Sequence, residues 1–167
     1  MKHYPQLAKK LREQLAHVEP ILINGIKYFP CSVYTVNGQF LPCVYIVEAD
    51  GYFKHWGIWP EDDHAKYSIP LGEVSSIADS PNRLPAKFAA RIYKAGESGM
   101  GYHSFSIKFN NGFEQKYIGG GAIDFINYPK ELNQNDIKDI TLYSGTLGEL
   151  LSSPTYYWCL YDASSPS

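Results

Sequence analysis

The sequence has few cysteines, few charges and no long apolar run, and each shortage removes a class of protein. Its 167 residues include only 3 cysteines, an odd number without a Cys-x-x-Cys pair, which argues against a disulfide scaffold. Charged residues make up 19% of the chain, with 15 Lys and Arg against 17 Asp and Glu. No basic surface for nucleic acid is therefore expected. No window approaches the roughly 18 apolar residues of a membrane helix.

What the chain does have is an excess of aromatic side chains. Phe, Trp and Tyr make up 15% of the residues, with 14 Tyr, 8 Phe and 3 Trp. This composition argues against disorder, collagen and coiled coil. The length predicts a single domain over 1–167, made of a helical segment at 1–19, a β-rich core at 20–162 and a frayed tail at 163–167.

The start of the chain does not resemble a secretory signal, because basic residues are scattered through it and no apolar stretch follows. There is also no Asn-x-Ser/Thr acceptor for glycosylation. We therefore expect a cytoplasmic protein with buried free thiols. A hairpin turn at Asn37-Gly38 places Cys31 opposite Val44, so Cys31 and Cys43 point to opposite faces of the sheet and cannot form a disulfide.

The first residues predict a helix over 5–16. Leu7, Leu11 and Leu15 recur with a period near four, and polar residues fill the other face. That spacing is typical of an amphipathic helix.

Residues 20–60 change to β patterns. Three dipeptides typical of hairpin turns, Asn24-Gly25, Asn37-Gly38 and Asp50-Gly51, separate five predicted strands. These strands are 21–23, 26–29, 31–36, 40–48 and 52–59. The nearly continuous apolar run at 43–48 predicts a strand that is central or covered on both faces. The Asp50-Gly51 turn would pair Tyr45 with Trp56.

Residues 60–85 are interpreted as a long connection with one helical turn near 71–78, and 86–126 as a strand meander. In the meander, a three-residue loop at 110–112 pairs Phe109 with Phe113 and Lys108 with Glu114. This register gathers the aromatic residues of the hairpin, Phe113 among them, on one face.

The last third predicts a strand or short helix at 136–143, a short helix that Thr146 caps and that ends before Pro154, and a final strand at 156–161. The expected fold is α+β with a large, mainly antiparallel sheet. We expect that sheet to be curled, a partial barrel or a sandwich, with an N-terminal helix and a short C-terminal helix packed on it.

Candidate binding residues are the aromatic and acidic side chains without an expected core role. They are Trp56, Trp59, Glu61, Asp62, Asp63, His64, Tyr156 and Trp158. Tryptophan anchors beside carboxylates suit a basic protein surface. Together with His55, the cluster at 61–64 also offers oxygen and nitrogen ligands for a metal ion, although its spacing matches no known metal motif.

Two further polar residues fall among apolar neighbours. His103 lies on the apolar face of the meander and predicts a buried, hydrogen-bonded histidine. Asp124 lies between Ile123 and Phe125, so a buried carboxylate with an Arg or Tyr partner is expected.

No catalytic or cofactor motif is present, so the chain leans toward a non-enzyme without a cofactor. The leading hypothesis is a protein-interaction module, such as a cytosolic inhibitor or immunity-type protein whose partner is basic. The first alternative is a small molecule or sugar bound in an aromatic-lined β cleft. The second is a metal-assisted hydrolase. Nucleic acid and membrane are not expected partners, and self-association is left open.

Overall fold

The computed structural model describes residues 2–142 and 149–164. By their contacts, the residues divide into two compact units, one formed by 1–80 with 155–167 and the other by 81–154. We call them unit 1 and unit 2. The expectation of one domain over 1–167 stays a prediction.

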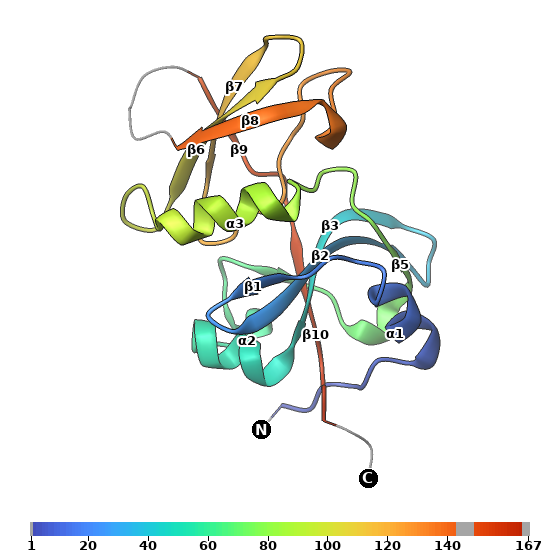
Figure 1. Cartoon of the computed structure of the whole chain (residues 1–167). Helices are drawn as coiled ribbons and strands as arrows, with labels where there is room; N and C mark the ends of the chain where they lie inside the picture. The colour runs from blue at the N-terminus through green and yellow to red at the C-terminus, as the bar shows by residue number, and fades with distance from the viewer. Residues whose placement is uncertain (1, 143–148, 165–167) are drawn as a thin grey trace. The chain divides into compact units, whose positions relative to one another are not determined.

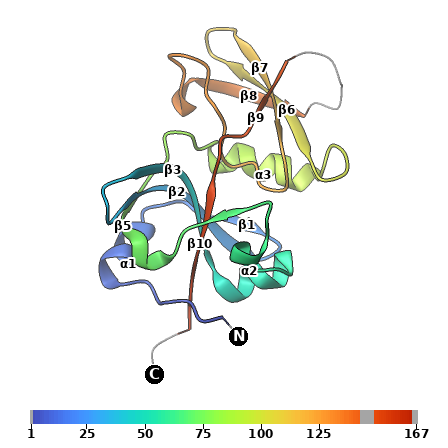
Figure 2. The same cartoon turned by 180° about the vertical axis from the view of Figure 1, so that it is seen from behind.

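Unit 1 is built on a six-stranded sheet to which both ends of the chain contribute (Figure 1). The order is β1-β2-β3-β10-β4, and β5 pairs with β2. The strands are β1 (Ile21–Ile23), β2 (Ile26–Thr35), β3 (Phe40–Glu48), β4 (Tyr67–Ser68), β5 (Val74–Ala78) and β10 (Tyr157–Tyr161). Strand β10 is parallel to both β3 and β4, and Figure 2 shows it running through this unit.

Two helices cover different sides of β3, which explains why its residues are apolar on both faces. Leu11 and Leu15 of α1 (Lys9–Leu15) belong to the buried cluster that contains Val44 and Ile46. The next residue along the strand, Tyr45, points the other way. It stacks on Trp158, which in turn contacts α2 (Ala49–Trp56). The prediction of a strand that is central or covered on both faces is confirmed.

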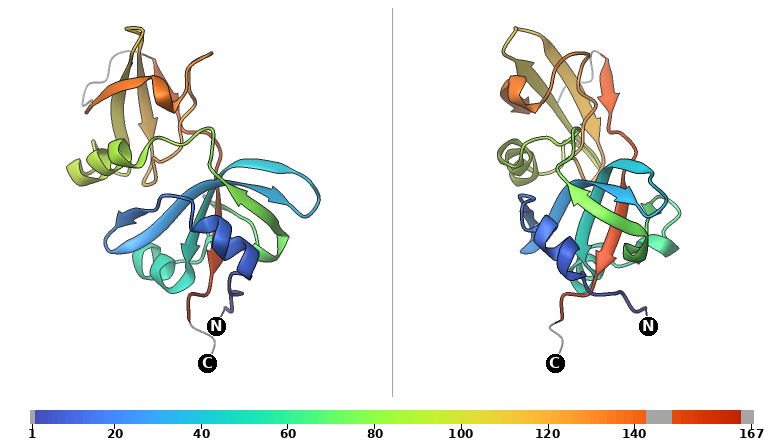
Figure 3. Two further views of the ribbon diagram at one scale, coloured as in Figure 1. Left: turned by 45° about the vertical axis from the view of Figure 1, so that its right-hand side comes forward. Right: turned by 90° about the vertical axis from the view of Figure 1, so that its right-hand side faces the viewer.

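Unit 2 consists of one continuous stretch of chain. Its sheet has the order β8-β6-β7-β9, from β6 (His103–Phe109), β7 (Glu114–Gly119), β8 (Ile137–Leu142) and β9 (Leu150–Ser152). Helix α3 (Ala86–Ala95) lies along this sheet (Figure 3) and buries Phe88, Ala89 and Ile92. Short 3-10 turns complete both units, namely η1 (Pro60–Asp62), η2 (Leu71–Glu73) and η3 (Gln134–Asp136).

The α+β class is confirmed, but the sheet prediction is wrong in two respects. The strands form two sheets rather than one large one, and both sheets are mixed because β3–β10, β10–β4 and β7–β9 are parallel pairs. Turn dipeptides indicate only pairings between neighbouring strands. The parallel pairs join segments that are far apart in the sequence, and no local sequence pattern predicts them.

The helix positions also differ from the prediction. Helix α1 begins at Lys9 instead of residue 5, because the preceding segment hydrogen-bonds to the end of the chain. The Pro5 carbonyl accepts from Asp162 N at 2.9 Å, and Gln6 Nε2 donates to Ser164 O at 2.7 Å. The Pro5 carbonyl is thus used outside the helix, and the Gln6 side chain holds the same segment.

The predicted strand at 52–59 is helical over most of its length. The Glu48 carboxylate accepts from the backbone N–H groups of Asp50 and Gly51, which caps α2, and Gly57 ends the helix at φ +75°. Asp50-Gly51 therefore lies in the first turn of a helix rather than in a hairpin. As a result, Tyr45 is opposite Trp158 in the sheet and not opposite Trp56.

The expected strand at 86–95 is α3, whose buried residues at 88, 89 and 92 follow helical spacing. At the other end of unit 2, Thr146, the expected cap of a C-terminal helix, lies outside the described residues. The described residues after it form strand β9, so that helix does not extend to Pro154.

The hairpin of unit 2 has the predicted register. Lys108 pairs with Glu114, and Phe109 N donates to Phe113 O at 2.8 Å around a three-residue loop whose Gly112 has φ +89°. The expectation that Phe113 faces the core is wrong, because its side chain is 46% exposed at the end of the hairpin.

The buried polar residues of unit 2 are placed as predicted. His103 is buried, and its Nδ1 lies 2.8 Å from Gly120 O. The fully buried Asp124 accepts a hydrogen bond from the Tyr93 hydroxyl at 2.5 Å. Tyrosine, rather than Arg91, is therefore a partner of this carboxylate, since Arg91 pairs with Asp139.

The three cysteines are buried, and none of them forms a disulfide among the described residues. Cys31 lies opposite Val44 as predicted, although a bulge follows between Cys31 and Val33. Burial raises the pKa of both Cys43 and Cys159 to about 12, so these side chains stay as thiols. Among the described residues, no helix is long and apolar enough to cross a membrane.

Candidate functional site

The sequence-predicted site residues all lie in unit 1, but they separate into a surface group and a core group. The surface group is centred on Trp59, which directly precedes the turn η1. Its indole stacks on Phe53 of α2 with ring centres 4.4 Å apart and lies 5.2 Å from the ring of Tyr4. Since Gly57 ends α2 in a left-handed conformation, the chain turns back and brings Trp59 onto the helix.

The carboxylates of Glu61 and Asp62 stand next to these rings and are exposed. Lys2 Nζ lies 3.3 Å from Glu61 Oε2 and 3.1 Å from Asp62 Oδ1. The Tyr4 hydroxyl donates to Glu61 Oε2 at 2.8 Å. The hydrogen bond to Asp62 is the main cause that raises the pKa of Lys2. Burial, followed by the bond to Glu61, raises the pKa of Tyr4.

A cavity of about 630 Å³ opens beside these aromatic rings. It is lined by Lys2, His3, Tyr4, Ala49, Asp50, Phe53, Trp59, Asp162 and Ser164. We call these residues, together with Glu61 and Asp62, the Trp59 surface. Asp162 is held in place because its carboxylate accepts from both the N–H and the hydroxyl of Ser164. These bonds lower the pKa of Asp162 and keep it ionised.

The neighbouring acidic residue, Asp63, is turned toward a different partner. It accepts from Ala65 N at 3.0 Å and lies 3.4 Å from Lys66 Nζ, and these groups lower its pKa, the backbone bond most strongly. The Lys66 ammonium lies 3.5 Å from the centre of the Trp56 ring, a close cation–π contact. His64 is exposed on the same connection.

The core group is an aromatic cluster around Trp158, which is only 1% exposed. Trp158 stacks on Tyr45 at 4.6 Å and meets Tyr52, Trp56 and Tyr156 edge-on at 5.1, 5.6 and 6.0 Å. We call these five residues the Trp158 cluster. Three of the predicted binding aromatics therefore belong to packing, and Trp158 in particular presents no surface to a partner.

The described part of the chain holds no cluster of side chains suited to bind a metal ion. No three His, Cys, Asp or Glu side chains lie there in an arrangement that could hold a metal ion. The carboxylates at 61–63 face Lys2 and Lys66 instead. His55 Nδ1 lies 3.2 Å from Asn24 Nδ2, and burial, followed by the charge of Lys66, lowers the pKa of His55.

Sequence reasoning missed Lys2, Tyr4, Phe53 and Lys66. Phe53 could have been found by interpreting 49–56 as a helix, since Glu48 suits an N-cap contact and Gly57 suits a helix end. The other three reach their partners across long stretches of chain or through a local turn, and their spacing in the sequence carries no comparable pattern.

No protein-family model matches the chain, and neither a curated protein nor a solved structure matches it.

Proposed function

We propose that this protein is a non-catalytic binding module that recognises a basic protein partner through the Trp59 surface. The observation that carries the proposal is the set of three contacting rings, Tyr4, Phe53 and Trp59, beside a cavity bordered by carboxylates. Aromatic faces attract an ammonium or guanidinium group by about 0.5–2 kcal/mol, depending on how far the cation is desolvated.

The chain's own Lys2 already pairs with the carboxylates of this surface. Its ammonium group lies against Glu61 and Asp62, and its side chain remains 36% exposed. An exposed ion pair of this kind contributes little to stability. An Arg or Lys of a partner can therefore displace Lys2 at low cost and gain contact with the rings as well.

The acidic groups around the cavity also favour a basic partner during encounter. Asp50 and Asp162 line the cavity, and Glu61 and Asp62 lie next to it. Complementary charge chiefly speeds association and rejects partners of like charge. The proposal includes the role of a cytosolic inhibitor or immunity-type protein that binds a basic enzyme. The three buried cysteines without disulfides support a reducing compartment.

The test is binding of a fluorescent tetra-arginine peptide, measured by anisotropy, with a tetra-glutamate peptide as the charge control. We expect the wild type to prefer the arginine peptide and Trp59→Ala to weaken that binding by about tenfold, equivalent to 1.4 kcal/mol. Phe113→Ala is the control, because it also removes an aromatic ring but from unit 2. It should bind like the wild type.

A second variant separates charge from ring contact. Asp62→Asn keeps the size of the side chain and is expected to weaken binding of the arginine peptide less than Trp59→Ala does, with a reduced dependence on salt. Equal binding of both peptides by the wild type, or equal effects of Trp59→Ala and Phe113→Ala, would contradict the proposal.

A further inference from the structure

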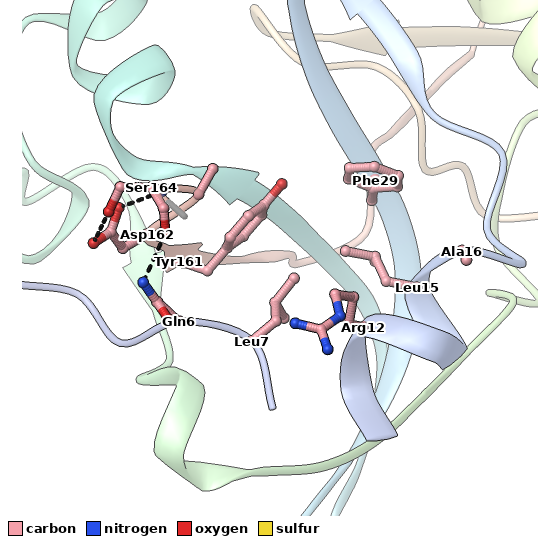
Figure 4. A pocket seen from close by; sticks show the side chains of 10 residues that line it. Gln6, Leu7, Arg12, Leu15, Ala16, Phe29, Tyr161, Asp162 and Ser164 are labelled. Carbon is pink, nitrogen blue, oxygen red and sulfur yellow. Dashed lines mark hydrogen bonds between the residues drawn. The ribbon is translucent and has the colours of Figure 1, made fainter. Parts of the chain in front are cut away.

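Unit 1 contains a second, smaller cavity of about 380 Å³, whose chemistry differs from that of the Trp59 surface. It lies between the segment at 6–7, helix α1, strand β2 and the end of β10, and Figure 4 shows its side chains. Its lining is Gln6, Leu7, Arg12, Leu15, Ala16, Phe29, Tyr161, Asp162, Ala163 and Ser164. Only Asp162 and Ser164 are shared with the larger cavity.

The walls of this cavity are mainly apolar and firmly held. Leu15 is buried in the core of unit 1, and Leu7, Phe29 and Tyr161 pack against that core. The size falls within the range of about 300–1,000 Å³ that small-molecule sites occupy. These walls suit a compact hydrocarbon or aromatic group.

The polar side chains at one end of the cavity already have partners. Gln6 Nε2 donates to Ser164 O at 2.7 Å, and Asp162 accepts from the N–H and hydroxyl of Ser164 at 2.8 Å each. In Figure 4 this group lies to the left of the cavity, away from Arg12, Leu15 and Phe29. The Asp162 carboxylate therefore lies at the opposite end of the lining from the Arg12 guanidinium.

Arg12, an exposed residue at the other end of the lining, has no such partner in the described part of the chain. Among the residues that the structure describes, its guanidinium makes no hydrogen bond or ion pair, whereas Arg91 pairs with Asp139. Figure 4 shows this guanidinium extending toward Leu7 beside the apolar walls. A guanidinium offers a planar fork of donors that matches a carboxylate in two-point contact.

We propose that this cavity binds a small monocarboxylate with an apolar tail, its carboxylate held by Arg12 and its tail packed among Leu7, Leu15 and Phe29. The apolar walls supply the affinity, and the single cation selects an anionic head group. Tyr161 adds a hydroxyl to the lining. This site shares Asp162 and Ser164 with the Trp59 surface, but it takes a different class of ligand.

The test uses octanoate as the probe and follows backbone amide shifts by NMR during titration. Octan-1-ol supplies the tail without the charge, and acetate supplies the charge without the tail. We expect octanoate to bind with shifts at Leu15, Phe29 and Tyr161, and both controls to bind at least about tenfold more weakly, since each lacks one of the two contributions.

Two variants assign the binding to this cavity. Arg12→Gln should weaken octanoate by about tenfold, as expected for loss of a charge-assisted hydrogen bond, while the matched control Arg91→Gln leaves it unchanged. Ala16→Leu, at an exposed lining position, should weaken octanoate by narrowing the cavity. Octanol binding as tightly as octanoate would overturn the proposal, as would equal effects of Arg12→Gln and Arg91→Gln. Tighter binding of a peptide ending in leucine than of octanoate would overturn the choice of a small molecule.

Discussion

The two units differ in how far apart in the sequence their contacts reach. Unit 2 is a continuous stretch, 81–154, whose central hairpin closes through a three-residue loop. Unit 1 needs both ends of the chain, because β10 from the last residues inserts between β3 and β4. The residues of the Trp59 surface and of the smaller cavity that Arg12 lines belong to unit 1. Both cavities are lined by several different elements because unit 1 brings distant segments of the chain together.

The core chemistry of the two units differs as well. Unit 1 places the aromatic Trp158 cluster on one face of β3 and an aliphatic cluster on the other. Unit 2 buries a polar network in which Tyr93 donates to Asp124 and accepts from Ile123 N at 2.9 Å. Unit 2 also buries an apolar core, Phe105, Ile107 and Phe125 among it. The stability of both units should therefore depend on packing, and that of unit 2 also on this hydrogen-bonded network.

The largest expected effect follows from removing the central aromatic residue of unit 1. Trp158→Ala leaves a cavity in the Trp158 cluster, and large-to-small changes of buried aromatic residues cost about 3–5 kcal/mol. Native-state hydrogen exchange would measure this residue by residue. We expect protection to fall in β3 and β10 and to persist in β6 and β7. Equal loss of protection in both units would break the distinction between them.

A smaller effect is expected from Tyr93→Phe in unit 2. The change removes the hydroxyl that serves both the buried Asp124 and the Ile123 N–H. An unsatisfied buried group costs about 1–3 kcal/mol, which urea denaturation would detect. Tyr102→Phe is the control, because Tyr102 is 39% exposed. If both variants lose the same free energy of unfolding, the hydrogen bonds of the Tyr93 hydroxyl contribute nothing specific to the stability of unit 2.

The smallest effect concerns pH. The hydrogen bond from Arg91 is the main cause that lowers the pKa of Asp139, an exposed residue, below 3.8. Because the folded state then binds fewer protons than the unfolded state, this contribution to stability is present above the unfolded pKa and is lost as pH falls through the folded pKa. Asp139→Asn should reduce the loss of stability in acid, as followed by thermal melting between pH 5 and about 2. An unchanged acid profile would show that the Arg91–Asp139 pair contributes nothing to unit 2.

Local sequence chemistry predicted several elements of both units well. Asn24-Gly25 forms the turn between β1 and β2, with both residues at positive φ, and β1 and β3 have the predicted bounds. The loop at 110–112 was found because only one register gave clean alternation of apolar and polar residues. In each case the information lies within a few residues of the turn.

Prediction from turn dipeptides failed where the same dipeptide is compatible with either a hairpin or a helix. Asp50-Gly51 suits a hairpin turn, yet it also suits the first turn of a helix once the Glu48 carboxylate caps it. The predicted site residues separate into a surface group and a core group for a related reason. Trp59 and Trp56 are three residues apart and both half-buried, but α2 ends between them, so Trp59 stacks on Phe53 and Trp56 packs against Trp158.

The sequence by itself determined the α+β class, the free cysteines, the central position of β3, the register of the unit 2 hairpin and the burial of His103 and Asp124. These follow from turn residues and from the alternation or continuity of apolar residues, which act over short distances. Only the tertiary structure decided that β10 lies between β3 and β4, that Lys2 meets Glu61, and that the Arg12 guanidinium borders an apolar cavity. The physical reason is that these contacts join segments far apart in the chain, whose pairing depends on how the whole unit packs.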